Sequence, residues 1–178
     1  MTKEFFEHLL RDFAPLFHQR SVKKGALLHR ENEICLKLYF VGEGLLRSFY
    51  HVDGRDVTAH FAFQYGIIGA IDSILKNKPS RYNIEAIETS KLFVINYIEL
   101  EDYLMRNPQF EKLARKVTQY LYLDLVERVE GMTFLTASDK YNHLIARYPD
   151  ITNKVSLGHI ATYLGISQET LSRVRSGQ

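Results

Sequence analysis

The sequence VSLGHIATYLGISQETLSRVR, residues 155–175, has the pattern of two short helices joined by a tight turn. Apolar residues recur at helical spacing before and after that turn: Leu157, Ile160, Ala161, Leu164, Ile166, Leu171 and Val174. Ala161 supplies a small residue where the helices cross, and Gly165 tolerates the left-handed backbone of the turn. Ser167 can cap the second helix, with Glu169 favourably placed against the helix dipole. We therefore expect a helical hairpin closed by a small apolar core.

The second helix of this hairpin keeps a polar side once its inward positions are assigned. The residues on that side are Gln168, Glu169, Thr170, Ser172, Arg173 and Arg175. Arginine can donate two hydrogen bonds to guanine, glutamate can accept from the cytosine amino group, and glutamine can pair with adenine. The pattern predicts sequence-specific binding of double-stranded DNA, with the N-terminal end of the helix in the major groove. Spacing alone also permits an ordinary hairpin in which Glu169 and Arg173 form a surface ion pair.

A long helix is expected before this hairpin, over residues 107–131. Apolar residues recur there at spacings of three and four, with Gly131 expected to end the helix: Phe110, Leu113, Ala114, Val117, Leu121 and Leu125. Such a rod, roughly 30 Å long, can pack on its own domain alone or also on the same helix of a second subunit. We favour a two-fold homodimer. The candidate interface residues are Phe110, Val117, Leu121 and Leu125.

A shorter helix should follow, with Ser138 as its N-cap and Tyr148-Pro149 as its end. The segment Asp150–Lys154 is expected to be a short connection to the hairpin.

Residues 20–98 are expected to form an all-β stretch of short antiparallel strands, preceded by an amphipathic N-terminal helix. Turn signals interrupt it at Lys24-Gly25, Gly42-Glu43-Gly44, Asp53-Gly54, Tyr65-Gly66 and Asn77-Lys78-Pro79-Ser80. Asp53-Gly54 between two segments of high strand propensity predicts a β-hairpin. The regular turn spacing indicates a small β-roll or sandwich.

Composition limits the class of protein further. The chain has 178 residues, 46% hydrophobic and 25% charged, which is typical of a globular protein. Cys35 is the only cysteine, so one chain cannot form a disulfide or ligate an iron–sulfur cluster through cysteines. No secretory signal and no apolar run of membrane-spanning length are visible, so a cytoplasmic protein without membrane contact is expected. Residues 1–137 are balanced in charge, and the net positive charge lies in residues 138–178.

The stretch IATYLGISQETLSR, residues 160–173, closely resembles the helix-turn-helix of the Crp/Fnr family of bacterial transcription regulators. The order of the remaining segments is similar to that family over nearly the whole chain. The resemblance implies an α+β fold: an antiparallel β-roll (double-stranded β-helix) with flanking helices over residues 1–106, a dimerisation helix over 107–131, and a helix-turn-helix domain over 132–178. It also places Glu169, Ser172 and Arg173 at base-contacting positions and implies a palindromic site with TTGA-like half-sites.

The small-molecule effector of such a regulator is not evident from the sequence. By the resemblance, the candidate effector-binding residues are Gly69, Ala70, Ser80 and Arg81. Family members that bind cyclic AMP have a glutamate where Ala70 stands and an arginine before the hydroxyl residue, whereas Arg81 follows Ser80. This departure argues against cyclic AMP. An unidentified effector, or a roll that has lost sensing, remain open.

Haem ligation is another alternative, but none of His29, His51 and His60 is singled out as an axial ligand.

Two other classes of protein are alternatives to the regulator. A cupin-like metal-dependent enzyme needs clustered histidines and carboxylates, but the chain has no His-x-His, and His51, His60 and Glu85 would meet only through the fold. A ligand-binding interaction module would use the terminal hairpin for protein contacts without binding DNA. We expect no enzyme activity, with neither a catalytic nor a metal site. No wing strands follow Arg175, so fewer phosphate contacts than usual are expected.

Overall fold

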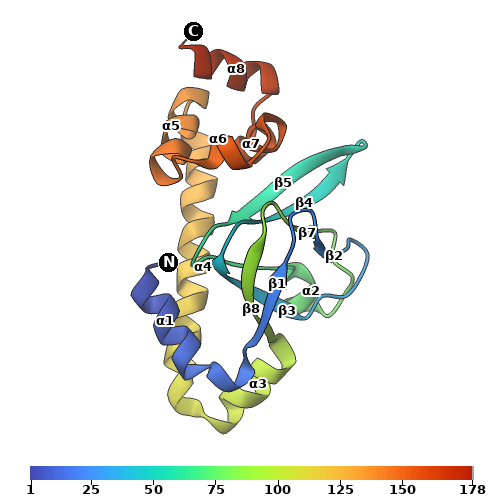
Figure 1. Ribbon diagram of the computed structural model, residues 1–178, viewed down its shortest axis with the longest axis vertical. Helices are drawn as coiled ribbons and strands as arrows, with labels where there is room; N and C mark the ends of the chain where they lie inside the picture. The colour runs from blue at the N-terminus through green and yellow to red at the C-terminus, as the bar shows by residue number, and fades with distance from the viewer. Residues whose placement is uncertain (178) are drawn as a thin grey trace. The chain divides into compact units, whose positions relative to one another are not determined.

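The computed structural model describes residues 1–177 and divides into two compact units. The first unit comprises Met1–Tyr50 and Ala59–Thr118, and the second comprises His51–Thr58 and Gln119–Gln178. Strands lie in the first part of the chain and a series of helices in the last part (Figure 1). The predicted α+β fold, an antiparallel β-roll with flanking helices, is confirmed. Within residues 1–177, no helix combines the length and apolar character needed to cross a membrane.

The roll consists of two four-stranded antiparallel sheets. One sheet has the order β1-β8-β3-β6 and the other the order β2-β7-β4-β5. The strands are β1 (His18–Val22), β2 (Leu27–His29), β3 (Lys37–Glu43), β4 (Leu46–Val52), β5 (Arg55–Ala62), β6 (Ile67–Gly69), β7 (Asn83–Ala86) and β8 (Ser90–Asn96). Consecutive strands alternate between the two sheets except for β4 and β5, which pair with each other, and the apolar faces of the two sheets form one core.

The predicted Asp-Gly hairpin joins β4 and β5. Asp53 and Gly54 both have positive φ, 49° and 73°, which gives the two-residue turn whose twist matches that of the strands. Gly44, with φ of 102°, lies so close to Ser90 that a side chain at this position would collide with the Ser90 backbone. The turn residues therefore act through backbone geometry, as the sequence indicated.

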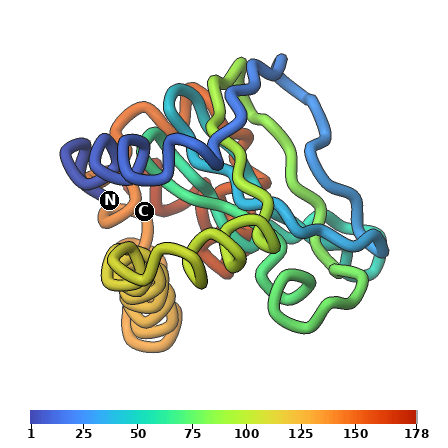
Figure 2. The backbone as a smooth tube through the Cα atoms, turned by 90° about the horizontal axis from the view of Figure 1, so that it is seen from below, coloured from blue at the N-terminus to red at the C-terminus, as the bar shows by residue number. Residues whose placement is uncertain are grey.

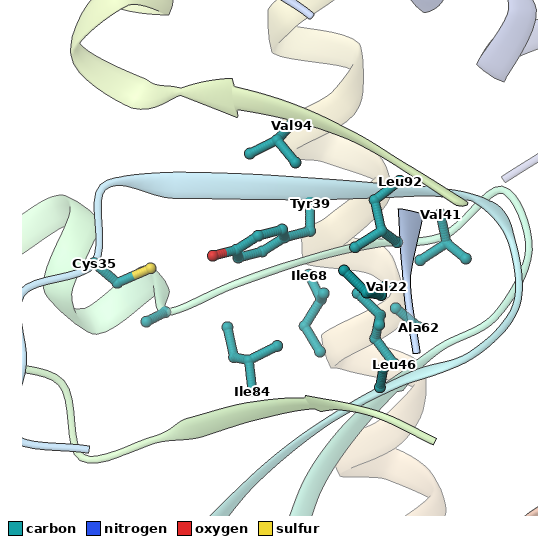
Figure 3. Close-up of a cluster of buried hydrophobic side chains, with 12 residues drawn as sticks. Val22, Cys35, Tyr39, Val41, Leu46, Ala62, Ile68, Ile84, Leu92 and Val94 are labelled. Atoms are coloured by element: carbon teal, nitrogen blue, oxygen red, sulfur yellow. The ribbon is translucent and has the colours of Figure 1, made fainter. Parts of the chain in front are cut away.

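The core of the roll lies between the sheets and is shown in Figure 3. Tyr39 of β3 occupies its centre and is 1% exposed, with its hydroxyl donating to the Leu28 carbonyl at 3.1 Å. Cys35 is buried nearby, as a small apolar residue would be. The other members of this cluster are Val22, Val41, Leu46, Ala62, Ile68, Ala70, Ile84, Ala86, Leu92 and Val94.

The expectation of an all-β segment over residues 20–98 is wrong at one place. Helix α2 (Ile71–Lys76) follows β6 and buries Ser73 and Ile74. At six residues it is too short to show a helical apolar period. The Ser73 hydroxyl accepts a hydrogen bond from the Cys35 backbone at 2.9 Å, a tertiary contact that sequence spacing does not reveal.

Two helices flank the roll in the first unit. Helix α1 (Lys3–Asp12), followed by the short turn η1 (Ala14–Leu16), buries Phe6 and Leu9. Helix α3 (Tyr97–Arg106) follows β8 and leads through η2 (Pro108–Phe110) to the long helix.

The long helix α4 spans Glu111–Phe134, so the predicted range of 107–131 is shifted at both ends. Gly131 does not end the helix, because its φ is not positive and its carbonyl accepts a hydrogen bond from the Leu135 amide at 3.2 Å. Its coiled backbone is drawn in yellow to orange in Figure 2. It begins in the first unit and ends in the second.

The helix after α4 has a different cap from the one expected. Helix α5 spans Ala137–Arg147, and Thr136 rather than Ser138 is its N-cap. Thr136 and Asp139 form a capping box, in which each side chain accepts from the backbone amide of the other. Tyr148 ends the helix as predicted, since the residue before proline is disfavoured in the helical region. The expected connection after it is instead a short helix, α6 (Ile151–Lys154), held by the buried Ile151.

Acid should destabilise this fold through His29. The side chain is 6% exposed, and no partner for its Nε2 exists among residues 1–177. Burial lowers the pKa of His29, while Glu33 and Asp72 partly oppose that shift. The unfolded chain therefore binds this proton more readily, so stability is complete above the ordinary histidine pKa of about 6.5 and falls as the pH drops below it.

We measure the free energy of unfolding in urea at pH 7.5 and at pH 5.5. Between these two pH values it should fall more for the native protein than for His29→Gln. The remaining histidines are common to both proteins, so the difference isolates His29. Equal losses in the two proteins would contradict the prediction.

Candidate nucleic-acid interface

The predicted helical hairpin consists of α7 (Leu157–Leu164) and α8 (Gln168–Ser176). Gly165 ends α7 in the left-handed region, with φ of 67°, as its position in the sequence predicted. The Ile166 amide donates back to the Ala161 carbonyl at 3.0 Å, which closes the last turn of α7. The chain then changes direction over only three residues, so the two helices meet at a defined angle.

Serine residues begin both helices of the hairpin. The Ser156 hydroxyl accepts from the His159 amide at 3.2 Å, and the Ser167 hydroxyl accepts from the Thr170 amide at 3.1 Å. These bonds satisfy amides that have no partner within their own helix. The cap on α8 matters for the site because it orders the end of the helix that carries the polar residues.

A small apolar core holds the hairpin. Ile160 and Leu171 are fully buried, Ala161 is 2% exposed, and Leu164 is also buried. Leu157, Ile166 and Val174, which were predicted to join this core, are half-buried. Helix α5 packs on both α7 and α8. The buried residues contributed from outside the hairpin are Leu144, Ile151 and Val155. The helices α5 to α8, called here the C-terminal helical module, therefore share one core.

The polar side of α8 is exposed, as predicted for five of its six residues. These five are Gln168, Glu169, Ser172, Arg173 and Arg175. The sixth, Thr170, is half-buried because its hydroxyl lies 3.1 Å from that of Ser167 and accepts from the Arg173 guanidinium at 3.4 Å. Thr170 thus helps to orient Arg173.

Glu169 is held in its charged form at the beginning of α8. Its own backbone amide and the Ser167 hydroxyl bind the carboxylate and lower the pKa of Glu169, and the positive charges of Arg173 and Arg55 add to this effect. A carboxylate at the N-terminal end of a helix is also favoured by the helix dipole. The arrangement presents one hydrogen-bond acceptor and one guanidinium on the same exposed helix face.

The C-terminal helical module is attached to α4 by polar and aromatic contacts. The Arg147 guanidinium of α5 lies 3.2 Å from Asp124 and 3.9 Å from Glu127 of α4. The Arg128 guanidinium lies 4.7 Å from the centre of the Tyr163 ring of α7. Burial raises the pKa of Tyr163 and of its neighbour Tyr148, the latter to about 12. These side chains line a cavity of about 290 Å³ and connect three helices of the second unit.

The four candidate effector residues lie at one corner of the roll. Gly69 and Ala70 lead into α2, and Ala70 is fully buried. The Asp72 carboxylate, in the first turn of α2, accepts from the Ser80 hydroxyl at 2.8 Å and from the Arg81 amide at 3.3 Å. The sequence pattern gave no signal for Asp72, since α2 itself was not predicted.

The Arg81 guanidinium packs on aromatic rings instead of lying at this corner, where it could bind an anion. The guanidinium lies 4.6 Å from the centre of the Tyr50 ring and 5.3 Å from that of Tyr82. Sequence reasoning also missed Arg47, which is 1% exposed and lies with its Nε 2.8 Å from Glu85 across the β4–β7 pair.

The four candidate dimer residues occupy different surroundings. Phe110 packs within its own chain, with ring centres 5.9 Å from Phe13 and 5.7 Å from Tyr103. Val117 and Leu121 are half-buried, and Leu125 is 57% exposed. The apolar residues that α4 leaves exposed at spacings of three and four are Tyr122, Leu125, Val129 and Met132.

The candidate metal and haem ligands have different surroundings. His29 is buried, and His51 lies 3.3 Å from Asp56. Glu85 is paired with Arg47. Among the 177 described residues, no three histidine, cysteine or acidic side chains gather closely enough to hold a metal ion.

Comparison with protein families matches residues 19–107, half of the chain, to the model of the cyclic nucleotide-binding domain. The chain belongs to the cyclic nucleotide-binding domain family. The matched range runs from Gln19 in β1 to Asn107, directly after α3, and includes the corner formed by Gly69, Ala70, Ser80 and Arg81. Curated proteins show no significant match to the sequence.

Solved structures resemble this cyclic nucleotide-binding domain protein over almost its whole length. FixK2 from Bradyrhizobium japonicum has a TM-score of 0.71 at 22% identity, covering 91% of this chain and 84% of FixK2. A CooA mutant from Carboxydothermus hydrogenoformans has a TM-score of 0.71 at 18% identity, covering 99% and 85%. A structure described as a transcriptional regulator of the Crp/Fnr family, from Eubacterium rectale, has a TM-score of 0.70 at 19% identity, covering 99% and 83%. The resemblance to Crp/Fnr regulators is confirmed in the fold.

The two glycines of the hairpin should respond oppositely to alanine in this cyclic nucleotide-binding domain protein. Gly165→Ala should lower the free energy of unfolding by about 1–2 kcal/mol, because a side chain is strained at its positive φ. Gly158→Ala should raise that free energy by about 0.5 kcal/mol, because Gly158 is helical and an added Cβ would make only an ordinary contact with Gln168.

Urea unfolding of both variants beside the parent protein measures these changes. A Gly165→Ala protein as stable as the parent would show that the turn does not depend on the left-handed residue.

Proposed function

We propose that this protein is a homodimeric, sequence-specific DNA-binding transcription regulator and not an enzyme. The observation that supports the proposal best is the exposed polar face of α8 on a capped helix whose opposite face is buried. Proteins with this fold named above include a transcriptional regulator of the Crp/Fnr family. In this proposal the roll, residues 1–106, binds the effector, the helix α4 (Glu111–Phe134) forms the dimer, and the remainder of the C-terminal range 132–178 binds DNA.

The residues of α8 have the chemistry needed to distinguish bases. The Arg173 guanidinium can donate two hydrogen bonds to guanine, and the Glu169 carboxylate can accept from the cytosine amino group. Ser172 lies between them in the sequence and is exposed on the same helix. Gln168, Thr170 and Arg175 complete the proposed surface. The target is a palindromic duplex with TTGA-like half-sites about one helical turn, ~34 Å, apart.

The proposed dimer forms along α4 between two copies of the chain. Tyr122, Leu125, Val129 and Met132 recur at spacings of three, four and three, which is the pattern of a coiled-coil seam. Of the interface residues expected from the sequence, Leu125 fits this seam best. Phe110 contributes to the core of its own chain instead.

The proposed effector of the roll is not a cyclic nucleotide. A cyclic phosphate needs hydrogen-bond donors, and at the candidate corner the Ser80 hydroxyl and the Arg81 amide already donate to Asp72. A phosphate at that corner would also face the negative charge of Asp72. Ala70 offers no carboxylate for a ribose hydroxyl. The roll therefore binds a different small molecule or serves as a dimer scaffold.

Selection of bound duplexes from a random pool tests the proposal directly. A regulator of this kind should enrich a palindrome, with affinity that falls steeply as salt rises because counterions are released. A pool without enrichment, or binding that does not depend on salt, would leave the hairpin as a protein-contact module and would refute DNA reading.

Two variants should separate base reading from general attraction to DNA. Arg173→Ala should cost about 1–3 kcal/mol of binding to the selected duplex and relax the preference at one base pair. Lys154→Ala, at the end of α6, should weaken binding to all sequences about equally. Titrations against the selected duplex and its single-base variants measure both effects. An unchanged base preference in Arg173→Ala would show that Arg173 does not contact the bases.

The seam predicts a loss of dimerisation in Val129→Asp. Two buried aspartates, each costing at least ~1 kcal/mol, should raise the dimer dissociation constant by roughly 30-fold or more. Lys116→Asp, an exposed α4 position outside the seam, should leave the constant nearly unchanged. Sedimentation equilibrium measures both. A Val129→Asp protein that dimerises like its parent would refute this interface.

A further inference from the structure

The tip of the β4–β5 hairpin belongs to the same compact unit as the C-terminal helical module. The Thr58 amide donates to the Thr162 hydroxyl of α7 at 3.1 Å, and the two hydroxyl oxygens lie 3.2 Å apart. Thr58 is 1% exposed, so this contact is shielded from water. The hairpin is therefore held against the first helix of the helix-turn-helix.

Arg55 lies between this contact and the end of the hairpin. It directly follows the Asp53-Gly54 turn and precedes Thr58 by three residues, so the turn and the contact fix the backbone on both sides of it. The Arg55 side chain is exposed. Its positive charge is the last and smallest of the causes that lower the pKa of Glu169, at the start of α8. An exposed guanidinium thus lies on a hairpin that is bonded to α7, the helix that precedes the one expected to enter the major groove.

We propose that Arg55 binds a phosphate of the DNA backbone, so that the β4–β5 hairpin and the recognition helix α8 contact the same duplex. This inference rests on the proposed function. The phosphates flank the major groove, and a guanidinium can bind two of their oxygens at once. The hairpin would supply a sequence-independent contact from outside the helix-turn-helix.

The alternative role for Arg55 is to pair with Glu169. The carboxylate of Glu169 already has other partners, since its own amide and Ser167 are the larger causes of its lowered pKa and Arg173 also precedes Arg55 among them. Arg55 makes none of the ion pairs found among the described residues. It therefore remains available for an external anion.

The salt dependence of binding distinguishes these roles. Affinities of the full-length dimer for the selected palindrome and for an unrelated duplex are measured between 50 and 200 mM salt. A dimer presents two copies of Arg55, so Arg55→Ala should make the slope of log affinity against log salt shallower by about 1.8. The affinity ratio between those salt concentrations should shrink about 12-fold for both duplexes alike. Arg55→Lys should retain most of the slope, because the charge is kept.

Arg30→Ala is the matched control, since it removes an exposed arginine from a loop of the roll and should leave the slope unchanged. An unaltered slope in Arg55→Ala would overturn the phosphate contact while leaving DNA binding itself intact. Tighter binding by Arg55→Ala, or an altered base preference, would assign Arg55 to the control of Glu169 instead. Failure of the parent protein to bind any duplex would refute the proposed function and is a different result.

The contact with α7 can be tested in the same assay. Thr162→Val removes the hydroxyl that holds Thr58, so the hairpin should no longer place Arg55 reproducibly. In that background Arg55→Ala should change the slope much less than in the parent protein. An equal change in both backgrounds would show that the Thr58–Thr162 contact does not position Arg55.

Discussion

The turn at Gly165 is the constraint on which the candidate site depends. A left-handed residue there allows α7 and α8 to meet over three residues, and the buried Ile160, Ala161 and Leu171 keep them together. Since these inward positions are committed to the core, the polar side chains of α8 have only one direction left. The site is thus a consequence of packing: the apolar face determines where Glu169 and Arg173 point.

Helix α4 contributes residues to both units. Its C-terminal half holds the C-terminal helical module through charged and aromatic contacts, including Arg147 with Asp124 and Arg128 with Tyr163. Polar contacts of this kind have stricter geometry than apolar packing. In the proposed dimer the same helix also carries the seam.

The roll has the fold of a cyclic nucleotide-binding domain, but the side chains at its candidate effector corner do not have the chemistry that a cyclic nucleotide needs. The family match covers residues 19–107, yet the Ser80 hydroxyl and the Arg81 amide donate to Asp72 within the chain. An internal carboxylate satisfies these donors without any bound anion. Family membership therefore establishes the architecture of the roll, whereas its ligand depends on a few side chains at one corner.

The sequence by itself determined the features that depend on local backbone chemistry and apolar spacing. These were the Asp53-Gly54 hairpin, the left-handed turn at Gly165, the Ser167 cap and the buried face of the helix-turn-helix. Only the tertiary structure decided where non-local partners meet. Helix α2 was too short to show a period, Gly131 continued a helix because of its backbone conformation, and Thr136 took the capping role expected of Ser138. Asp72 and the Thr58–Thr162 contact join residues that are 8 and 104 positions apart. Sequence periodicity carries no information on such contacts, because they depend on how separate elements pack.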